Sequence, residues 1–227
     1  MLNEDTRATL AQRLRDAENN VSPIAPLTDD HPDMTPDDAF EIQLVNIRRR
    51  LDAGAVVTGH KVGLASKAMQ EMMGVDEPDY GHLLDTMEYP EGTPIEAAKF
   101  CFPRVEVEVG FILGADIPPE GCSQAEAAEA IEWVVPSIEL IDTRIKDWNI
   151  KLCDTIADNA SSAGTWWARG AYAWPISTSP LSRPPSTKME SSWPRVTPTP
   201  CWATRSTPWG GWPRPSPSSA CACARAT

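Results

Sequence analysis

The chain has 227 residues and a formal net charge of −12, a length that suffices for one domain with a sizeable core. The acidic balance argues against a nucleic-acid partner, which needs a basic face, and no apolar run is long enough to cross a membrane. The first residues include acids and lack the apolar stretch of a secretory signal. The six cysteines form no C-x-x-C pair, so we expect a reduced, cytoplasmic protein.

The N-terminal third is predicted to be helical. Residues 4–19 suit an amphipathic helix. A second helix is expected after Thr35, a good N-cap, with Pro36 at the first helical position and Gly54 just past the end. The apolar stripe predicted for this helix consists of Phe40, Leu44, Ile47 and Leu51.

Strands and short helices are predicted for the following part of the chain. Strands are expected over residues 55–64, 104–113 and 134–142. Short helices are expected over residues 67–73 and after a capping box formed by Ser123 and Glu126. About 55 mostly helical residues followed by a strand-rich region indicate an α+β fold.

The segment "RVEVEVGF" places Glu106 and Glu108 two residues apart, so on a strand both point to the same face. One interpretation is an antiparallel strand with a solvated face. The alternative is a site for a hard metal ion such as Mg²⁺, which prefers carboxylate oxygens. Glu139, flanked by apolar residues on its own predicted strand, is the candidate for a third ligand, because a lone buried glutamate is costly.

Two further segments contain residues suited to chemistry. Lys61 lies between Gly59 and Gly63 in an apolar strand, where it either extends to solvent or stands near an anion held by a metal. The turn-rich stretch "GVDEPDYGHLLD" is either a solvated loop or a loop that closes over a site, with three candidate residues: Asp76, Asp79 and His82.

The segment "DTIADNASSAG" is the last of these motifs. It is either a simple turn or a nest of hydroxyl and backbone groups for a carboxylate. The polar residues in it are Asp158, Asn159, Ser161 and Ser162.

Four motifs taken together resemble one enzyme family: "GHKVGLASKAMQEMMGVDEPDYGHLLD", "PRVEVEVGFIL", "EWVVPSIELIDTRIKDW" and "DTIADNASSAG". The pattern is similar to the 2-hydroxypenta-2,4-dienoate hydratases, also called 2-oxopent-4-enoate hydratases, of the fumarylacetoacetate hydrolase superfamily. Their close relatives are the 4-oxalocrotonate decarboxylases. Each motif alone is a weak signal, whereas the four in this order and spacing are specific, and they cover nearly all of residues 1–173.

The resemblance implies a fold, a reaction and roles. The fold would be a helical N-terminal part followed by a β-rich mixed roll of the fumarylacetoacetate hydrolase type, with the last strands missing. The reaction would be the hydration of 2-hydroxypenta-2,4-dienoate to 4-hydroxy-2-oxopentanoate in the meta-cleavage catabolism of aromatic compounds. Magnesium or manganese would be held by Glu106, Glu108 and Glu139. Lys61 and Asp79 would be catalytic, and Ser161 would lie near the substrate carboxylate.

Two alternatives to the hydratase remain open at this stage. The first is the decarboxylase, because a metal chelate of the 2-oxo acid would stabilise the enolate in both reactions. The second is an inactive relative that acts only as a binding subunit. The resemblance also implies a homo-oligomer that acts on a small-molecule substrate, and it allows a complex with a neighbouring pathway enzyme.

Composition changes abruptly after residue 173. Residues 1–173 contain 14 basic and 31 acidic residues, whereas residues 174–227 contain six basic residues and one acid. The second segment holds 11 of the 22 prolines and only three residues of Val, Ile or Leu, too few to offset the entropy of ordering the backbone. We therefore expect a hydratase-like catalytic region over 1–173 and a disordered or irregular tail over 174–227.

A frameshift explains this tail better than a proline-rich binding segment or a linker. Read one base earlier, every Trp-Pro pair must encode alanine, and Met189-Glu190 must encode glycine. A compatible translation contains an Asp-Gly hairpin turn and an amphipathic helix that resembles the family's own C-terminal part. Our hypothesis is that one base was lost near Ala173.

Overall fold

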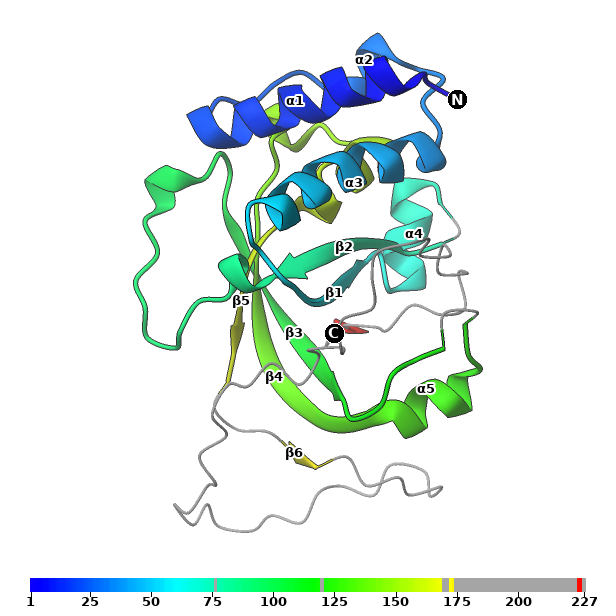
Figure 1. Cartoon of the computed structure of the whole chain (residues 1–227), viewed down its shortest axis with the longest axis vertical. Helices are drawn as coiled ribbons and strands as arrows, with labels where there is room; N and C mark the ends of the chain where they lie inside the picture. Colours follow the sequence, from blue (N-terminus) through cyan, green and yellow to red (C-terminus); the bar gives the residue numbers. More distant parts are fainter. Residues whose placement is uncertain (76, 119–120, 169–171, 174–223, 226–227) are drawn as a thin grey trace.

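The computed structural model describes residues 1–75, 77–118, 121–168, 172–173 and 224–225 (Figure 1). The predicted tail of residues 174–227 therefore lies almost wholly outside the described residues, as does Asp76. The helices are α1 (Glu4–Asn20), α2 (Leu27–Asp30), α3 (Pro36–Asp52), α4 (Lys67–Met73), α5 (Gln124–Ala130) and α6 (Leu152–Ala157). The strands are β1 (Val57–Gly63), β2 (Asp79–Leu84), β3 (Arg104–Leu113), β4 (Ile131–Ile141), β5 (Ser162–Trp167), β6 (Tyr172–Ala173) and β7 (Ala224–Arg225).

The helical layer forms for the local reasons that the sequence indicates. The Thr35 side chain accepts a hydrogen bond from the Asp38 backbone N–H, the reciprocal bond is also present, and Pro36 opens α3. Gly54 lies just past the end of α3 with a φ of +100°, a left-handed conformation in which glycine is not strained. Both predicted N-terminal helices are confirmed.

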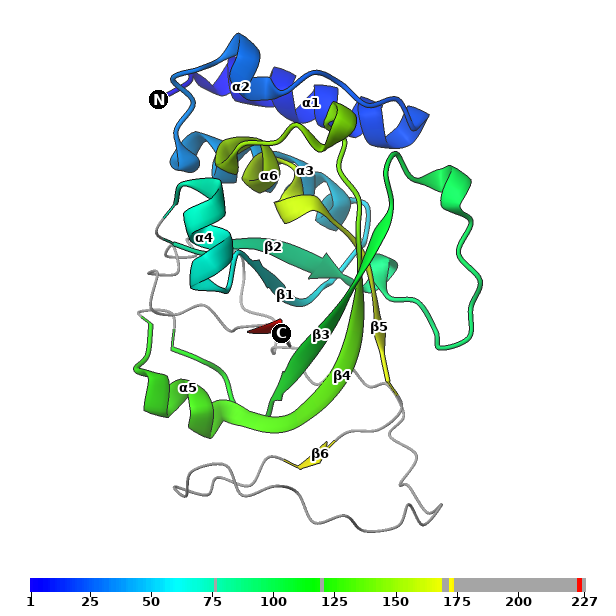
Figure 2. The same cartoon turned by 180° about the vertical axis from the view of Figure 1, so that it is seen from behind.

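The buried side of α3 differs from the predicted stripe. Ile47 is fully buried as predicted, whereas Phe40 is only partly buried. The reason is that α3 contacts α1 on one side and α6 on the other, so two faces of the helix are covered (Figure 2). The residues that α3 buries are Asp38, Ala39, Ile42, Gln43 and Ile47.

The strands form two antiparallel sheets. β1 and β2 form a two-stranded sheet, while β5, β4, β3 and β7 form a second sheet in that order, with β6 paired to β4. The helical layer lies at one end of the molecule, and the long curved β3–β4 pair extends away from it (Figure 1). The architecture is the predicted α+β fold.

Two strands of the sheets, β2 and β5, were not predicted from the sequence. The segment interpreted as a turn-rich loop contains β2, so Asp79 and His82 lie on a strand. Gly81 and Asp79 disfavour a strand in this segment, because glycine and aspartate are depleted in strands. Pairing along β1 outweighs this local preference, with Gly63 opposite Asp79 and Lys61 opposite Gly81.

Three buried carboxylates hold the helical layer together. Asp38 accepts hydrogen bonds from the backbone N–H of Leu2 and from Arg7. Asp154 accepts bonds from both the backbone N–H and the hydroxyl of Thr28, which ties α6 to α2. Asp158 accepts bonds from the backbone N–H and guanidinium of Arg144. Each of these carboxylates has its own donors, as buried charges require.

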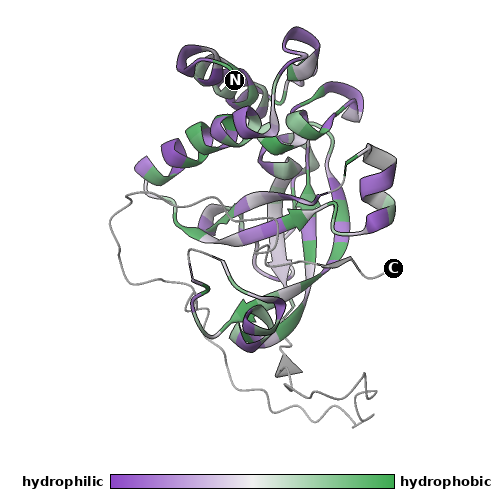
Figure 3. Ribbon diagram, turned by 90° about the vertical axis from the view of Figure 1, so that its right-hand side faces the viewer, coloured by the Kyte–Doolittle hydropathy of each residue, from purple (hydrophilic) through white to green (hydrophobic). Residues whose placement is uncertain are grey.

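The hydrophobic core lies mainly between these helices. In Figure 3 apolar and polar segments alternate along the N-terminal helices, as expected for helices with one buried side. The cysteines described here are free and partly buried: Cys101, Cys122 and Cys153. Within the described residues no helix has both the length and the hydrophobicity that a membrane span requires.

Candidate metal centre

Three glutamates converge on one face of the β3–β4 pair. Glu106 and Glu108 lie on β3, and Glu106 is directly opposite Glu139 on β4. Carboxylate oxygens of the three side chains lie within 4.8 Å of one another. Like charges at this distance repel one another unless a cation lies between them. The site is therefore suited to a divalent metal ion.

On β3 the face that carries the glutamates is more buried than the face that carries Val105 and Val107. This is the reverse of a strand with a solvated polar face. Glu108 and Glu139 are each only 6% exposed, whereas Val105 and Val107 are 70% and 72% exposed. The interpretation of "RVEVEVGF" as a strand whose glutamates face solvent is therefore wrong. Hydrophobic burial alone would favour buried valines and exposed glutamates. Placing the carboxylates inside therefore costs stability.

Lys61 connects the acidic cluster to the rest of the site. The side chain is 7% exposed, so the predicted alternative of a lysine that extends to solvent is excluded. Its Nζ donates a hydrogen bond of 2.7 Å to the carbonyl oxygen of Ala160 and lies 3.4 Å from Oε1 of Glu139. Burial by itself lowers the pKa of Lys61, but the carboxylates of Glu139, Asp79 and Glu106 outweigh burial and raise it. Lys61 is therefore an ammonium ion.

Glu139 experiences opposing influences. Burial raises the pKa of Glu139, the Lys61 ammonium lowers it, and the neighbouring Glu106 carboxylate raises it again, with a net increase. Repulsion between neighbouring carboxylates raises the pKa of Glu139. It also favours the binding of a cation, because a cation would offset the repulsion.

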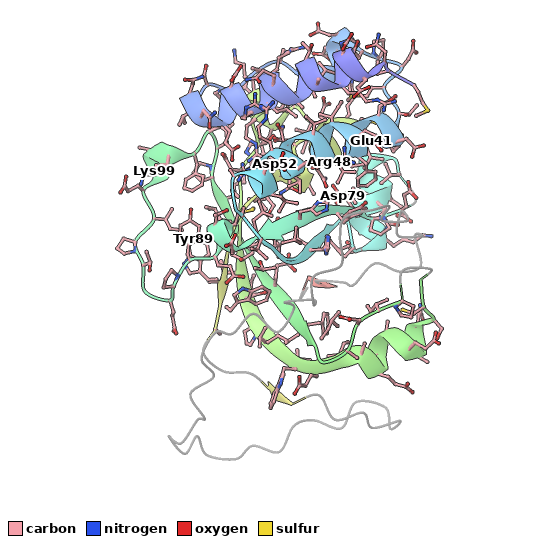
Figure 4. The ribbon with its side chains drawn as sticks, in the orientation of Figure 1. Glu41, Arg48, Asp52, Asp79, Tyr89 and Lys99 are labelled. Atoms are coloured by element: carbon pink, nitrogen blue, oxygen red, sulfur yellow. The ribbon has the colours of Figure 1, made fainter. Side chains whose placement is uncertain are left out.

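Asp79 lies at the start of β2, below α3 (Figure 4). It faces Gly63 across the β1–β2 pair, and a Cβ atom at Gly63 would lie 2.1 Å from Oδ1 of Asp79. Glycine is therefore required at position 63 by space, and this explains one glycine of the motif. Asp79 is 3% exposed, and it lies on the same strand face as Lys61.

A strained turn lies beside Lys61. Asn159, Ala160 and Ser161 have φ values of 55°, 51° and 54°, all left-handed and none of them glycine. Each such residue costs on the order of 1 kcal/mol, so the surrounding contacts must fix the turn. The Asn159 side chain accepts a hydrogen bond from the backbone N–H of His82 and donates one to its carbonyl oxygen. The turn thereby directs the carbonyl oxygen of Ala160 at Lys61.

Ser161 is 4% exposed and lies next to a residue that the sequence analysis did not single out. Oγ1 of Thr155 on α6 lies 3.4 Å from Oγ of Ser161 and 3.5 Å from Oδ2 of Asp79. The sequence signal for Thr155 is its position in the same motif, four residues before Asn159. On α6 this spacing places Thr155 about one turn from the strained segment.

His82 is not part of this arrangement. It pairs with His60 across the β1–β2 sheet, on the strand face opposite to Lys61. Its Nδ1 lies 2.8 Å from Oε1 of Gln43. Gln43 donates its own N–H groups to the carbonyl oxygens of Tyr80 and Ile156, so its oxygen accepts from His82. His82 is thereby assigned as a neutral, structural residue.

Comparisons with known proteins found similar enzymes among curated proteins and among solved structures. No family model matches the chain. The 2-keto-4-pentenoate hydratase of Paraburkholderia xenovorans (strain LB400) is 46% identical over 156 residues, which covers 69% of this chain and 58% of that protein. The 2-hydroxyhexa-2,4-dienoate hydratase of Comamonas testosteroni is 44% identical over 155 residues, 67% of this chain and 59% of that protein.

Among solved structures, the 4-oxalocrotonate decarboxylase from Pseudomonas putida G7, complexed with magnesium and adipate, matches with a TM-score of 0.71. The identity is 34%, and the match covers 76% of this chain and 66% of that chain. A structure of the decarboxylase from the same source complexed with calcium and acetate also has a TM-score of 0.71, at 32% identity.

The fold and the acidic centre define the class of protein, an α+β fold of the fumarylacetoacetate hydrolase type. Within that class, the chain is similar to curated 2-keto-4-pentenoate and 2-hydroxyhexa-2,4-dienoate hydratases at 44–46% identity, in line with the predicted resemblance. The chain spans less than two thirds of the length of the curated relatives it matches.

Proposed function

We propose that this chain carries the metal-dependent catalytic region of a 2-hydroxypenta-2,4-dienoate hydratase, which forms 4-hydroxy-2-oxopentanoate. The observation that supports this most strongly is the group of three carboxylates within 4.8 Å beside a buried lysine, in a chain whose relatives carry hydratase names. The catalytic region is assigned to residues 1–173.

Magnesium or manganese fits the donor set, because both ions prefer carboxylate oxygens. Glu106, Glu108 and Glu139 would hold the ion. When bound, it would supply Lewis-acid stabilisation of negative charge on the C2 oxygen of a 2-oxo or 2-hydroxydienoate acid. The same donor set accepts either ion, and metal titration of the purified chain decides between them.

Lys61 is proposed to stabilise negative charge on the substrate. Its ammonium group is held by the Ala160 carbonyl oxygen and faces Glu139, so a positive charge lies at the edge of the acidic centre. A cation fixed in a site with little water stabilises a developing enolate more than a cation in bulk water does.

Asp79 and Ser161 are proposed to act on the two ends of the substrate. Asp79 lies on the same strand face as Lys61 and would move the proton to and from the distal carbon or orient the attacking water. Ser161, at the end of the strained turn, would donate a hydrogen bond to the substrate carboxylate.

The decarboxylase is the second candidate, and one specific observation favours it. A 4-oxalocrotonate decarboxylase is among the solved structures that match this chain, with a TM-score of 0.71. Both reactions need an enolate stabilised at the same centre. Release of carbon dioxide from 4-oxalocrotonate, without hydration of the dienol, would select the decarboxylase.

The test of the hydratase is loss of dienol absorbance and formation of 4-hydroxy-2-oxopentanoate by the purified chain with magnesium. Removal of the metal with EDTA should abolish turnover, and added magnesium or manganese should restore it. If the folded protein transforms neither acid, the third hypothesis applies, an inactive relative that serves as a binding subunit.

Assembly and location also remain proposals. We expect a cytoplasmic homo-oligomer, because the resemblance implies one, and the resemblance also allows a complex with a neighbouring pathway enzyme. Light scattering of the purified chain measures the oligomeric state, and co-purification with the enzyme of an adjacent pathway step tests the complex.

The composition break supports a proposal about the gene. We propose that one base is missing upstream of Trp174, so that the segment over 174–227 is read in the wrong frame. Genomic DNA sequence across the codons for Tyr172 to Pro175 decides this, since an extra base there would restore the family's frame and its absence would make the tail genuine.

A further inference from the structure

Thr155 connects two residues that the proposed function uses. Its Oγ1 lies 3.5 Å from Oδ2 of Asp79 and 3.4 Å from Oγ of Ser161. The three side chains are 6%, 3% and 4% exposed, respectively. A hydroxyl group in such a buried place hydrogen-bonds to the polar atoms within reach. The three side chains therefore form one chain of hydrogen bonds.

The neighbours of Thr155 hold it in this position. Asp154 is bonded to the backbone N–H and the hydroxyl of Thr28, at 3.1 and 2.7 Å. The carbonyl oxygen of Ile156 accepts a 2.8 Å hydrogen bond from Nε2 of Gln43 on α3. Since the residues on both sides are anchored to other helices, the Thr155 hydroxyl is fixed between its two partners.

Counting protons shows that the two partners depend on each other. A hydroxyl group has one proton to donate, and an ionised carboxylate accepts only. When Asp79 is ionised, Thr155 donates to it, and the hydrogen bond between the two hydroxyl groups then requires Ser161 to donate to Thr155. While that hydrogen bond is kept, Ser161 offers only lone pairs to a ligand, and these repel an anion.

The order reverses when Asp79 carries a proton. Asp79 then donates to Thr155, and Thr155 donates to Ser161. Ser161 is then free to donate its own proton in a hydrogen bond to an anion. No proton is transferred along the chain, and only the direction of the hydrogen bonds changes.

We propose that Thr155 is a positioning residue that couples the binding of a carboxylate at Ser161 to the presence of a proton on Asp79. The proposal rests on the proposed function for the nature of the ligand, a 2-oxo or 2-hydroxydienoate acid. It explains how the substrate carboxylate would bind preferentially when Asp79 holds the proton that the distal carbon requires.

Lys61 on β1 is a charged group that interacts with Asp79, while Thr155 on α6 is neutral. An ammonium group favours the ionised carboxylate, and burial of the carboxyl group opposes it. The proposed coupling predicts that binding of the anion is accompanied by uptake of a proton.

The test is calorimetric and needs no turnover. 2-Oxopentanoate, a saturated acid that cannot be hydrated, is titrated into the magnesium-loaded full chain in Pipes and in Tris at the same pH. The difference in heat between the two buffers gives the protons taken up per site. The wild type should take up close to one proton.

Three variants separate positioning from packing. Thr155→Val keeps the shape without the hydroxyl, and it should bind 2-oxopentanoate about tenfold more weakly, with no linked proton uptake. Thr155→Ser keeps a hydroxyl and should restore both. Thr58→Val removes another buried threonine hydroxyl, one that donates to the Leu83 carbonyl oxygen, and should behave as the wild type.

The inference is overturned if the wild type takes up no proton, or if folded Thr155→Val takes up as many protons as the wild type. Should Thr155→Val fail to fold by circular dichroism, the proton uptake of the wild type and of Thr155→Ser still decides. Titration with magnesium alone should give equal affinity in all variants. If the protein does not hydrate the dienol but still takes up a proton when it binds 2-oxopentanoate, the proposed function is contradicted and the coupling through Thr155 is retained.

Discussion

Buried carboxylates serve different purposes in the helical layer and in the sheet. Asp38, Asp154 and Asp158 are 0%, 0% and 3% exposed, and each accepts hydrogen bonds from its own set of donors. The glutamates of the β3–β4 pair are grouped instead, with three carboxylates within 4.8 Å and one ammonium group, that of Lys61, beside Glu139.

This difference in hydrogen bonding and grouping gives a criterion for separating structural from functional carboxylates. A carboxylate with complete hydrogen bonding stabilises the fold, and its loss leaves buried donors without an acceptor. Carboxylates that repel one another cost stability until a cation binds, so their grouping is explained by function. Substitutions in the two regions should therefore affect different properties.

The largest expected effect is on activity. Glu106→Gln removes a proposed metal ligand and should lower kcat/KM by at least about 100-fold, since even residues that only support a ligand contribute 10 to 100-fold. The thermal midpoint of the metal-free protein should stay equal or rise, because one of three like charges is gone. Glu129→Gln, an exposed glutamate on α5, is the matched control, and full activity of Glu106→Gln would refute the metal assignment.

Stability should change most in the helical layer. Asp158→Asn leaves the buried Arg144 guanidinium without its counter-charge and should lower the free energy of unfolding by about 3 kcal/mol. Asp30→Asn removes a partner of the more exposed Arg13 and should cost less than about 1 kcal/mol. Urea unfolding measures both, and equal effects would mean that the two ion pairs contribute alike.

The dependence of stability on pH reports the buried histidines. Burial lowers the pKa of His60 to about 4, while burial and then the nearby His60 lower the pKa of His82 to about 3. The unfolded chain binds protons below about pH 6.5 that the folded chain does not. Stability is therefore complete above that pH and falls as the pH decreases, by at most about 1.4 kcal/mol per pH unit for each histidine.

The histidine contribution must be separated from that of Asp158. Burial raises the pKa of Asp158 to about 6 although Arg144 opposes this, and an acid with a raised pKa favours the folded state at low pH. The change in slope between the wild type and His82→Asn, measured by urea unfolding from pH 7.5 to 4.5, isolates His82. An unchanged slope would show that His82 is protonated in the folded protein.

The smallest effect is expected on the outer face of the sheet. Val107 is 72% exposed, so Val107→Thr should change the free energy of unfolding by no more than about 0.5 kcal/mol and leave activity intact. A loss comparable to that of Asp158→Asn would mean that this face is covered in the protein in solution.

Much of the fold could be predicted from local patterns. Caps and spacing identified α1, α3, α4, α5 and β3, because these elements depend on signals within a few residues. β2 was missed because its glycine and its aspartate disfavour a strand locally, and only pairing with β1 makes it one. The buried side of α3 was predicted only in part, because two helices pack against it.

The sequence by itself determined the two-residue spacing of Glu106 and Glu108, the family resemblance and the identity of the candidate residues. The tertiary structure alone decided which face of β3 is buried, because alternation gives two faces without saying which one points inward. It also decided that Lys61 meets Glu139 and that Thr155 lies between Asp79 and Ser161, since these contacts join segments that are distant in the chain.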